Sequence, residues 1–152
     1  PIISDAAISK CPSDRGIAVG RHQFVRSYAL NSYLNNIAPS GPLSAAHVRF
    51  STLADLQRAN PSSILTFLDV DWPSLCMPEF RFEMGRSSYF HRPGSYHNRS
   101  GVLGMADGHV ESRRWRDPSL RPNNTKDNRH GTTARLPTDV QWLQERATIP
   151  IR

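Results

Sequence analysis

The sequence predicts a small α+β domain: an antiparallel β-sheet with a C-terminal β-hairpin, two short helices and long loops. The chain has 152 residues, and 38% of them are hydrophobic, which is enough for one modest core. Its 12 prolines and 9 glycines favour short strands and many loops over a helical bundle. Asp107-Gly108 between two strand-like runs is a strong hairpin signal. We therefore treat residues 1–152 as a single domain.

The first third of the chain predicts one strand and one helix. Residues 1–20 contain a turn-forming cluster without periodicity, so an irregular segment is expected there. Residues 24–34 alternate imperfectly between large apolar and polar side chains, which indicates a strand. Ser51 has the chemistry of an N-cap for a short helix over residues 52–59, and Asn60-Pro61 ends that helix.

The middle of the chain predicts a central strand followed by a long excursion. Residues 64–70 form the most apolar run and are typical of a buried strand. Residues 71–94 are rich in proline, serine, arginine and aromatic residues. We expect them to form a long loop with a short strand around residues 80–82.

The hairpin is the clearest element in the sequence. Its strands lie on either side of Asp107-Gly108, a pair that supplies the two left-handed residues of a type I′ turn. In that register three apolar side chains share the buried face: Leu103, Met105 and Val110. Two charged side chains lie on the opposite face: Glu111 and Arg113.

The C-terminal part predicts a polar loop and a second helix. Residues 117–131 are rich in proline, asparagine and aspartate and are expected on the surface. Pro137-Thr138-Asp139 supplies an N-cap and an acidic first turn for a helix that ends near Thr148.

The basic charge comes almost entirely from arginine. The formal net charge is +6, and only Lys10 and Lys126 are lysines. A binding surface for a polyanion is one interpretation, carried by six arginines: Arg81, Arg86, Arg92, Arg113, Arg114 and Arg116. We favour the alternative of arginines scattered over a solvated surface, because only the last three form a tight cluster. A nucleic-acid partner is not expected.

The two cysteines leave two interpretations open. Cys11 and Cys76 could form a single disulfide in an oxidising compartment, or they could be two unrelated thiols. Neither belongs to a CxxC pair, so a structural zinc site or a redox motif is not expected.

The sequence predicts no catalytic residues and no cofactor, apart from a minority hypothesis of bound calcium. It lacks the HExxH, GxSxG, P-loop and dinucleotide-binding patterns. Calcium could bind Asp69 and Asp71 at the end of the central strand, or the polar loop that contains Asp117 and Asp127. Carboxylates at a strand end are more often solvated or paired with arginine.

One spacing connects this chain to a known family. His97 is followed by nine residues and then by Asp107-Gly108, and residues 11–14, 26–31 and 64–69 occur upstream in a fitting order. The arrangement resembles the prepilin-type processing-associated H-X9-DG proteins, a pseudopilin-like family. Residues 142–146 are similar to the end of such proteins.

The resemblance implies a structural role outside the cytoplasm. It implies a pilin-like head that assembles with other pilin-like subunits into a pilus-like or type II secretion pseudopilus-like filament, extracellular or in the cell envelope. Members of the family begin with a prepilin cleavage site and a hydrophobic helix, and this chain has neither. We therefore expect the globular head alone, which would meet a membrane only through that absent helix.

Two other functions remain as alternatives. A secreted arginine-rich module could bind a polyanion, such as nucleic acid or an acidic polysaccharide. A metal-dependent hydrolase could use His97, Asp107 and His109. We favour a structural interpretation of the motif, in which Asp107-Gly108 builds the turn and His97 fixes the preceding loop.

Overall fold

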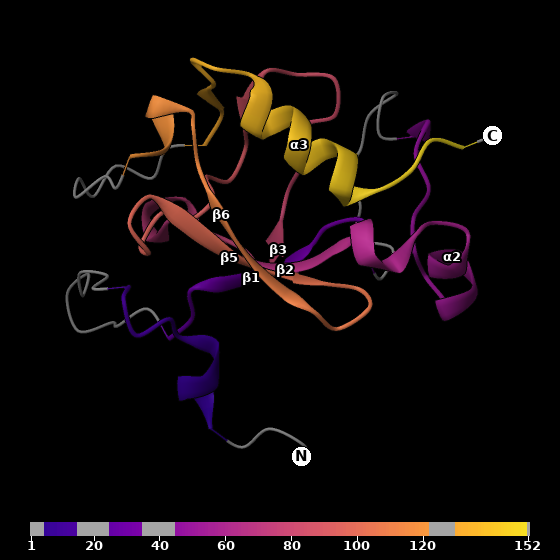
Figure 1. Cartoon of the computed structure of the whole chain (residues 1–152), viewed down its shortest axis with the longest axis horizontal. Helices are drawn as coiled ribbons and strands as arrows, with labels where there is room; N and C mark the ends of the chain where they lie inside the picture. Colours follow the sequence, from indigo (N-terminus) through magenta and orange to yellow (C-terminus); the bar gives the residue numbers. More distant parts are fainter. Residues whose placement is uncertain (1–4, 15–24, 35–44, 122–129, 152) are drawn as a thin grey trace.

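The computed structural model describes residues 5–14, 25–34, 45–121 and 130–151, and it confirms the predicted α+β class. Figure 1 shows a central sheet of five strands, in the order β3-β1-β2-β5-β6. A second sheet pairs β4 with β7. The strands are β1 (Tyr28–Asn31), β2 (Leu65–Asp69), β3 (Glu79–Phe80), β4 (Ser88–Tyr89), β5 (Ser100–Met105), β6 (Val110–Arg114) and β7 (Thr132–Thr133). The helices are α2 (Leu53–Gln57) and α3 (Thr138–Ala147).

The hydrophobic core lies between α3 and one face of the central sheet (Figure 1). Side chains alternate between the two faces of a strand, so cross-strand partners share a face. Ala29, Leu68 and Leu103 are such partners on β1, β2 and β5, and all three are buried. Val140 and Leu143 of α3 belong to the same cluster, which makes this the core face of the sheet.

Asn31 ties the end of α3 to the sheet. Its side-chain amide donates hydrogen bonds to the carbonyls of Leu65 and Ala147, both at 2.8 Å, and its carbonyl accepts one from the Tyr33 N–H at 2.9 Å. Asn31 is completely buried, so these bonds replace those it would make with water.

The strand predictions hold with one correction of topology. The central strand and the short strand near residue 80 are confirmed. The first strand, predicted over residues 24–34, is confirmed only over Tyr28–Asn31; Phe24, its expected start, lies outside the described residues. The sheet is not wholly antiparallel, because β3 pairs with β1 in parallel. β2 runs antiparallel to β1. After β2 the chain reverses direction again and adds β3 on the other side of β1, so β3 has the same direction as β1.

The hairpin of β5 and β6 is confirmed, but its predicted turn type is wrong. The Met105 N–H donates to the His109 carbonyl at 2.9 Å, and the Gly108 N–H donates to the Met105 carbonyl at 3.0 Å. These bonds enclose a three-residue loop in which only Gly108 has a positive φ, 94°. A type I′ turn needs two such residues, whereas a type I turn followed by one left-handed residue needs only one.

The longer loop also overturns the predicted faces of β6. One extra loop residue shifts the register by one, and a one-residue shift moves every side chain to the other face of the sheet. Val110 therefore pairs with Gly104 and is 66% exposed, although it was expected in the core. Glu111 pairs with the buried Leu103, so its side chain lies on the core face.

Both predicted helices are present with different caps. Thr52, rather than Ser51, is the N-cap of α2 and forms a capping box with Asp55. At α3, Pro137 occupies the N-cap position without a side-chain cap bond. Asp139 is the predicted acid of the first turn, and it is completely buried. Among the described residues, no helix combines the length and apolar character that crossing a bilayer requires.

Candidate functional site

The structure separates the histidine of the H-X9-DG spacing from its Asp-Gly. Asp107 bonds locally, accepting the His109 N–H at 3.1 Å and lying 2.6 Å from the His109 Nδ1. His97 closes a tight turn before β5 through two backbone bonds with Ser100. Within the described part of the chain, no hydrogen bond or ion pair joins His97 to Asp107 or His109, so the three groups of the hydrolase hypothesis do not form one site.

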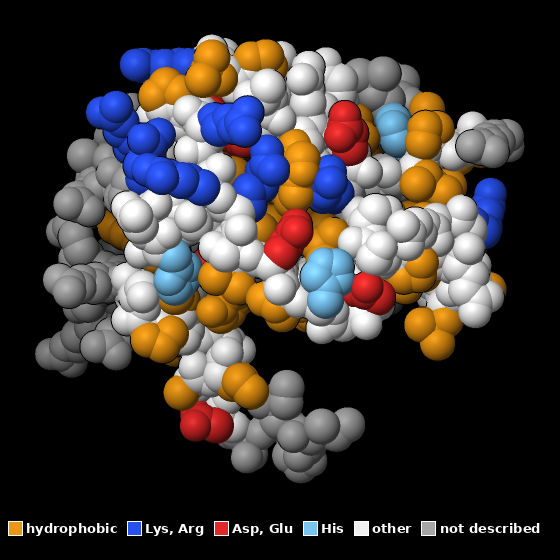
Figure 2. Space-filling model, in the orientation of Figure 1, with side chains coloured by type: hydrophobic (Ala, Val, Ile, Leu, Met, Phe, Trp, Pro, Cys, Tyr) orange, Lys and Arg blue, Asp and Glu red, His pale blue; other side chains and the backbone are white. Residues whose placement is uncertain are grey.

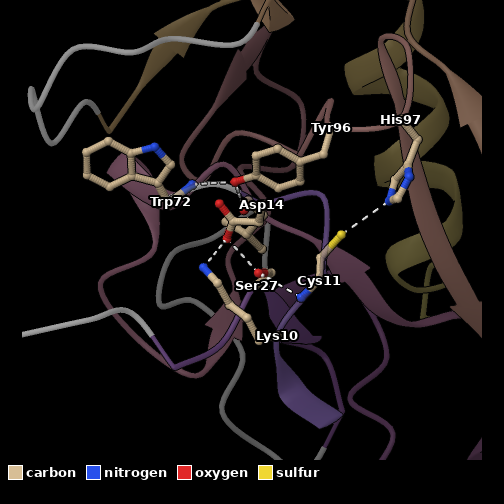
Figure 3. A network of polar contacts seen from close by, with 8 residues as sticks. Lys10, Cys11, Asp14, Ser27, Trp72, Tyr96 and His97 are labelled. Atoms are coloured by element: carbon tan, nitrogen blue, oxygen red, sulfur yellow. Dashed lines mark hydrogen bonds and ion pairs between the residues drawn. The ribbon is translucent and has the colours of Figure 1, made fainter. Parts of the chain in front are cut away.

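His97 instead contacts two residues that are distant in sequence. Its Nε2 lies 3.3 Å from the Cys11 Sγ and 3.6 Å from the Asp69 Oδ2. Cys11 comes from the N-terminal segment, Asp69 from the end of β2, and His97 from the turn before β5. Figure 3 shows the contact between Cys11 and His97. We call Cys11, Asp69 and His97 the His97 centre.

Asp69 is the acid of this centre and is only 1% exposed. It pairs with Tyr28 across β1 and β2, on the sheet face opposite α3. Its Oδ2 accepts the Val102 N–H at 2.9 Å, and its Oδ1 is buried without a hydrogen-bond partner. Burial raises the pKa of Asp69 to about 6; the Val102 N–H and His97 oppose this rise, and the nearby Asp14 adds to it.

A polar network fixes the N-terminal segment beside this centre (Figure 3). Asp14 accepts hydrogen bonds from the Lys10 Nζ and the Ser27 Oγ, both at 2.6 Å. The Ser27 Oγ in turn accepts the Cys11 N–H at 3.1 Å. Because Ser27 directly precedes β1, these bonds hold Cys11 against the sheet.

The predicted calcium ligands do not converge among the described residues. Asp71 forms an ion pair with Arg92 at 2.6 Å, while Asp69 faces His97. Asp117 accepts hydrogen bonds from the Tyr89 hydroxyl and from backbone N–H groups. Asp127 lies outside the described residues. Groups of the chain itself therefore pair with Asp71 and Asp117, while Asp69 contacts a different set of residues.

The cysteines are two free thiols in two different clusters, so the disulfide interpretation is wrong for this structure. Cys11 is buried beside His97, whereas Cys76 is exposed and its Sγ lies 3.4 Å from the His91 Nε2. His91 is completely buried, and its Nδ1 accepts the Arg81 N–H at 2.9 Å. With His130, these residues form a second group of closely spaced metal-ligand atoms.

The six predicted arginines do not form one surface. Arg92 is buried on Asp71, and Arg113 pairs with Asp139 at 3.1 Å and lies over the Trp142 ring at 3.9 Å. The other arginines have separate environments: Arg81 over Phe90, Arg86 near Glu83, and Arg114 and Arg116 exposed. Figure 2 shows basic side chains gathered over β6 and beside α3.

Sequence reasoning missed a pocket of about 500 Å³ next to the buried Arg92. Its lining combines basic and hydroxyl side chains: Arg92, Pro118, Ser119, Arg121, Thr132, Thr133 and Arg135. Two buried polar atoms of this lining, the Arg92 Nε and the Ser119 Oγ, have no hydrogen-bond partner. No local pattern could reveal it, because the lining comes from three segments of the chain.

The second feature that sequence reasoning missed is an apolar row across the sheet face opposite α3. It runs over four adjacent strands through cross-strand partners: Leu30, Phe67, Gly104 and Val110. Phe67 is 53% exposed and Val110 is 66% exposed. Large apolar side chains gathered on one exposed face are typical of an interaction surface. We call these four residues the open row.

No family model, no curated protein and no solved structure matches this chain. The resemblance to H-X9-DG proteins therefore remains a prediction from the sequence.

The buried His91 should make the stability of the domain depend on pH. Burial lowers the pKa of His91 to about 4, with the charges of His130 and Arg81 adding to the effect, against 6.5 for an unperturbed histidine. The unfolded chain binds this proton at a higher pH than the folded one. The contribution of His91 is therefore complete above about pH 6.5 and decreases as the pH falls toward 4, by about 3 kcal/mol.

The matched variant is His91→Asn, which retains an acceptor for the Arg81 N–H but does not titrate. Urea unfolding of both proteins at pH 7 and pH 4.5 measures the difference in unfolding free energy. We expect that difference to move by about 2 to 3 kcal/mol in favour of the variant at the lower pH. Equal pH slopes for the two proteins would show that His91 does not stay neutral in the fold.

Proposed function

We propose that this domain is a structural subunit of a pilus-like or type II secretion pseudopilus-like filament, located outside the cell or in its envelope. The observation that carries the proposal is the open row on the sheet face that α3 leaves uncovered. The H-X9-DG spacing supports it independently. The partners are other pilin-like subunits.

The shape of the open row suits an apolar helix from a neighbouring subunit. Four strands at a spacing of about 4.8 Å give the row a length of about 14 Å, and a helix with its side chains is about 10 Å wide. Gly104 lies between Phe67 and Val110 in the row and adds no side chain of its own. A helix seated there would remove both exposed side chains from water.

The His97 centre fits a structural role better than a catalytic one. Cys11 and Asp69 are both 1% exposed, so a substrate could not approach the thiol without displacing the N-terminal segment. The nucleophile geometry is also poor, because Cys11 and Asp69 face the same nitrogen of His97 instead of its two different nitrogens. We therefore propose no enzymatic activity for this domain.

Replacing Phe67 with arginine should abolish assembly without unfolding the domain. A charge placed in the open row must be desolvated when a helix covers it, whereas in the isolated domain this exposed position tolerates it. The measurement is the amount of the chain in filaments sheared from the cells that make it, detected with an antibody. Leu53→Arg is the matched control, because Leu53 is 79% exposed on α2.

We expect at least a tenfold loss of filament-associated chain for Phe67→Arg and little change for Leu53→Arg. Thermal unfolding of both purified variants should agree with that of the unmodified chain within a few degrees. Normal assembly of Phe67→Arg would contradict the proposal, as would the absence of this chain from any filament fraction.

A second candidate function is the binding of an acidic polysaccharide, favoured by the arginine-lined pocket. Arg121 and Arg135 line the pocket with three hydroxyl side chains, and the unpartnered Arg92 Nε and Ser119 Oγ could donate to an anionic oxygen. A sulfate or carboxylate group of a sugar chain has the size and charge for such a pocket.

Heparin chromatography tests this second function. The double variant Arg121→Ala/Arg135→Ala should elute at clearly lower salt than the unmodified chain. Arg49→Ala/Arg58→Ala removes the same charge from exposed positions and should elute later than the pocket variant. Identical elution of the two double variants would show only a general effect of net charge and refute a pocket site.

A further inference from the structure

We propose that Cys11, Asp69 and His97 bind a divalent transition metal, and that Zn²⁺ suits this set of ligands best. The three ligand atoms all lie within 4.8 Å of one another. Sulfur, imidazole nitrogen and carboxylate oxygen together are typical of zinc, whereas calcium takes oxygen ligands. This inference goes beyond the filament role and does not depend on it.

The distances within the centre match those around a tetrahedral ion. Zinc bonds of about 2.3 Å to sulfur and about 2.0 to 2.2 Å to nitrogen and oxygen place neighbouring ligand atoms about 3.3 to 3.6 Å apart. The Cys11 Sγ lies 3.3 Å from the His97 Nε2, and the Asp69 Oδ2 lies 3.6 Å from it. Two of the three ligand pairs therefore already have the spacing of a zinc site, and the Cys11 and Asp69 ligand atoms lie within 4.8 Å of each other.

Hydrogen bonding alone explains the arrangement less well. A distance of 3.6 Å is too long for a hydrogen bond between the His97 Nε2 and Asp69. One N–H of the ring also cannot point at both Cys11 and Asp69. A lone pair on Nε2, directed at an ion that lies between the three ligands, satisfies all of them at once.

The environment of Asp69 is independent support for a cation. Asp69 is 1% exposed, and its Oδ1 has no hydrogen-bond partner, although a buried polar atom normally has one. The Val102 N–H holds the Oδ2 at 2.9 Å and thereby orients the carboxylate, as outer hydrogen bonds do in known metal sites. A cation bound by both oxygens of the carboxylate would supply the missing partner of the Oδ1.

The centre also has a route for the ion and a position for a fourth ligand. The His97 side chain is 34% exposed, so solvent reaches one side of the centre. Three protein ligands and one water complete a four-coordinate zinc site.

The second group, Cys76, His91 and His130, fits a metal less well. The His91 Nδ1 accepts the Arg81 N–H, so the neutral ring carries its proton on Nε2, the nitrogen that faces Cys76. A metal needs a lone pair at that position. This group therefore supplies a matched control for the first, with one cysteine in each.

Titration of the metal-free chain with Co²⁺ tests the proposal. The protein is purified without a polyhistidine tag and treated with a chelator, and the near-ultraviolet charge-transfer band of a cobalt-bound thiolate is recorded. We expect the unmodified chain and Cys76→Ser to bind one Co²⁺ with this band, and Zn²⁺ to displace it. Cys11→Ser should lose the band.

His97→Gln is the second variant, because Cys11 is buried and its replacement could unfold the chain. We expect His97→Gln to keep the circular dichroism of the unmodified chain and to bind Co²⁺ at least about tenfold more weakly. Three results would overturn the proposal: no band in the unmodified chain, a band that depends on Cys76 instead of Cys11, or full affinity in His97→Gln. None of them bears on assembly through Phe67, so the two proposals can fail separately.

Discussion

A five-stranded sheet has two faces, and α3 covers only one of them. The rest of the structure depends on what covers the other face. The part around Asp69 is closed by the N-terminal segment and the turn at His97, which meet over it through polar contacts. The part around Phe67 stays apolar and half exposed. The first part is where we place an ion, and the second is where we place a partner subunit.

Buried carboxylates link segments of this small domain that are distant in sequence. Removing a carboxylate from water costs several kcal/mol unless charge and hydrogen bonds compensate it. Asp14 obtains that compensation from Lys10 and Ser27, and Asp139 obtains it from Arg113 and from two backbone N–H groups that precede α3. The contacts of Asp14 with Ser27 and of Asp139 with Arg113 each join segments that are distant in sequence. Asp69 differs from Asp14 and Asp139 in that its Oδ1 is buried without a hydrogen-bond partner.

Local signals in the sequence predicted the helices and strands. Contacts between residues distant in sequence determine which side chains meet. The apolar run at residues 64–70 and the Asp107-Gly108 turn were sufficient to predict β2 and the β5–β6 hairpin. The faces of β6 depend on a single loop residue, which no apolar pattern fixes, so Val110 was misplaced. Cys11 and His97 are 86 positions apart, and no periodic pattern in the sequence indicates that they meet. The H-X9-DG spacing drew attention to His97 but did not indicate its contacts with Cys11 and Asp69.

The central claim is that a partner covers the open row, and cysteine labelling tests it most directly. Phe67→Cys and Leu53→Cys would each be placed in a Cys76→Ser background, because Cys76 is exposed. A maleimide reagent should label both new cysteines readily in the purified chain, since both parent residues are more than half exposed. In the filament fraction from cells, we expect Leu53→Cys to react and Phe67→Cys to be protected. Equal labelling of the two positions in that fraction would contradict the account.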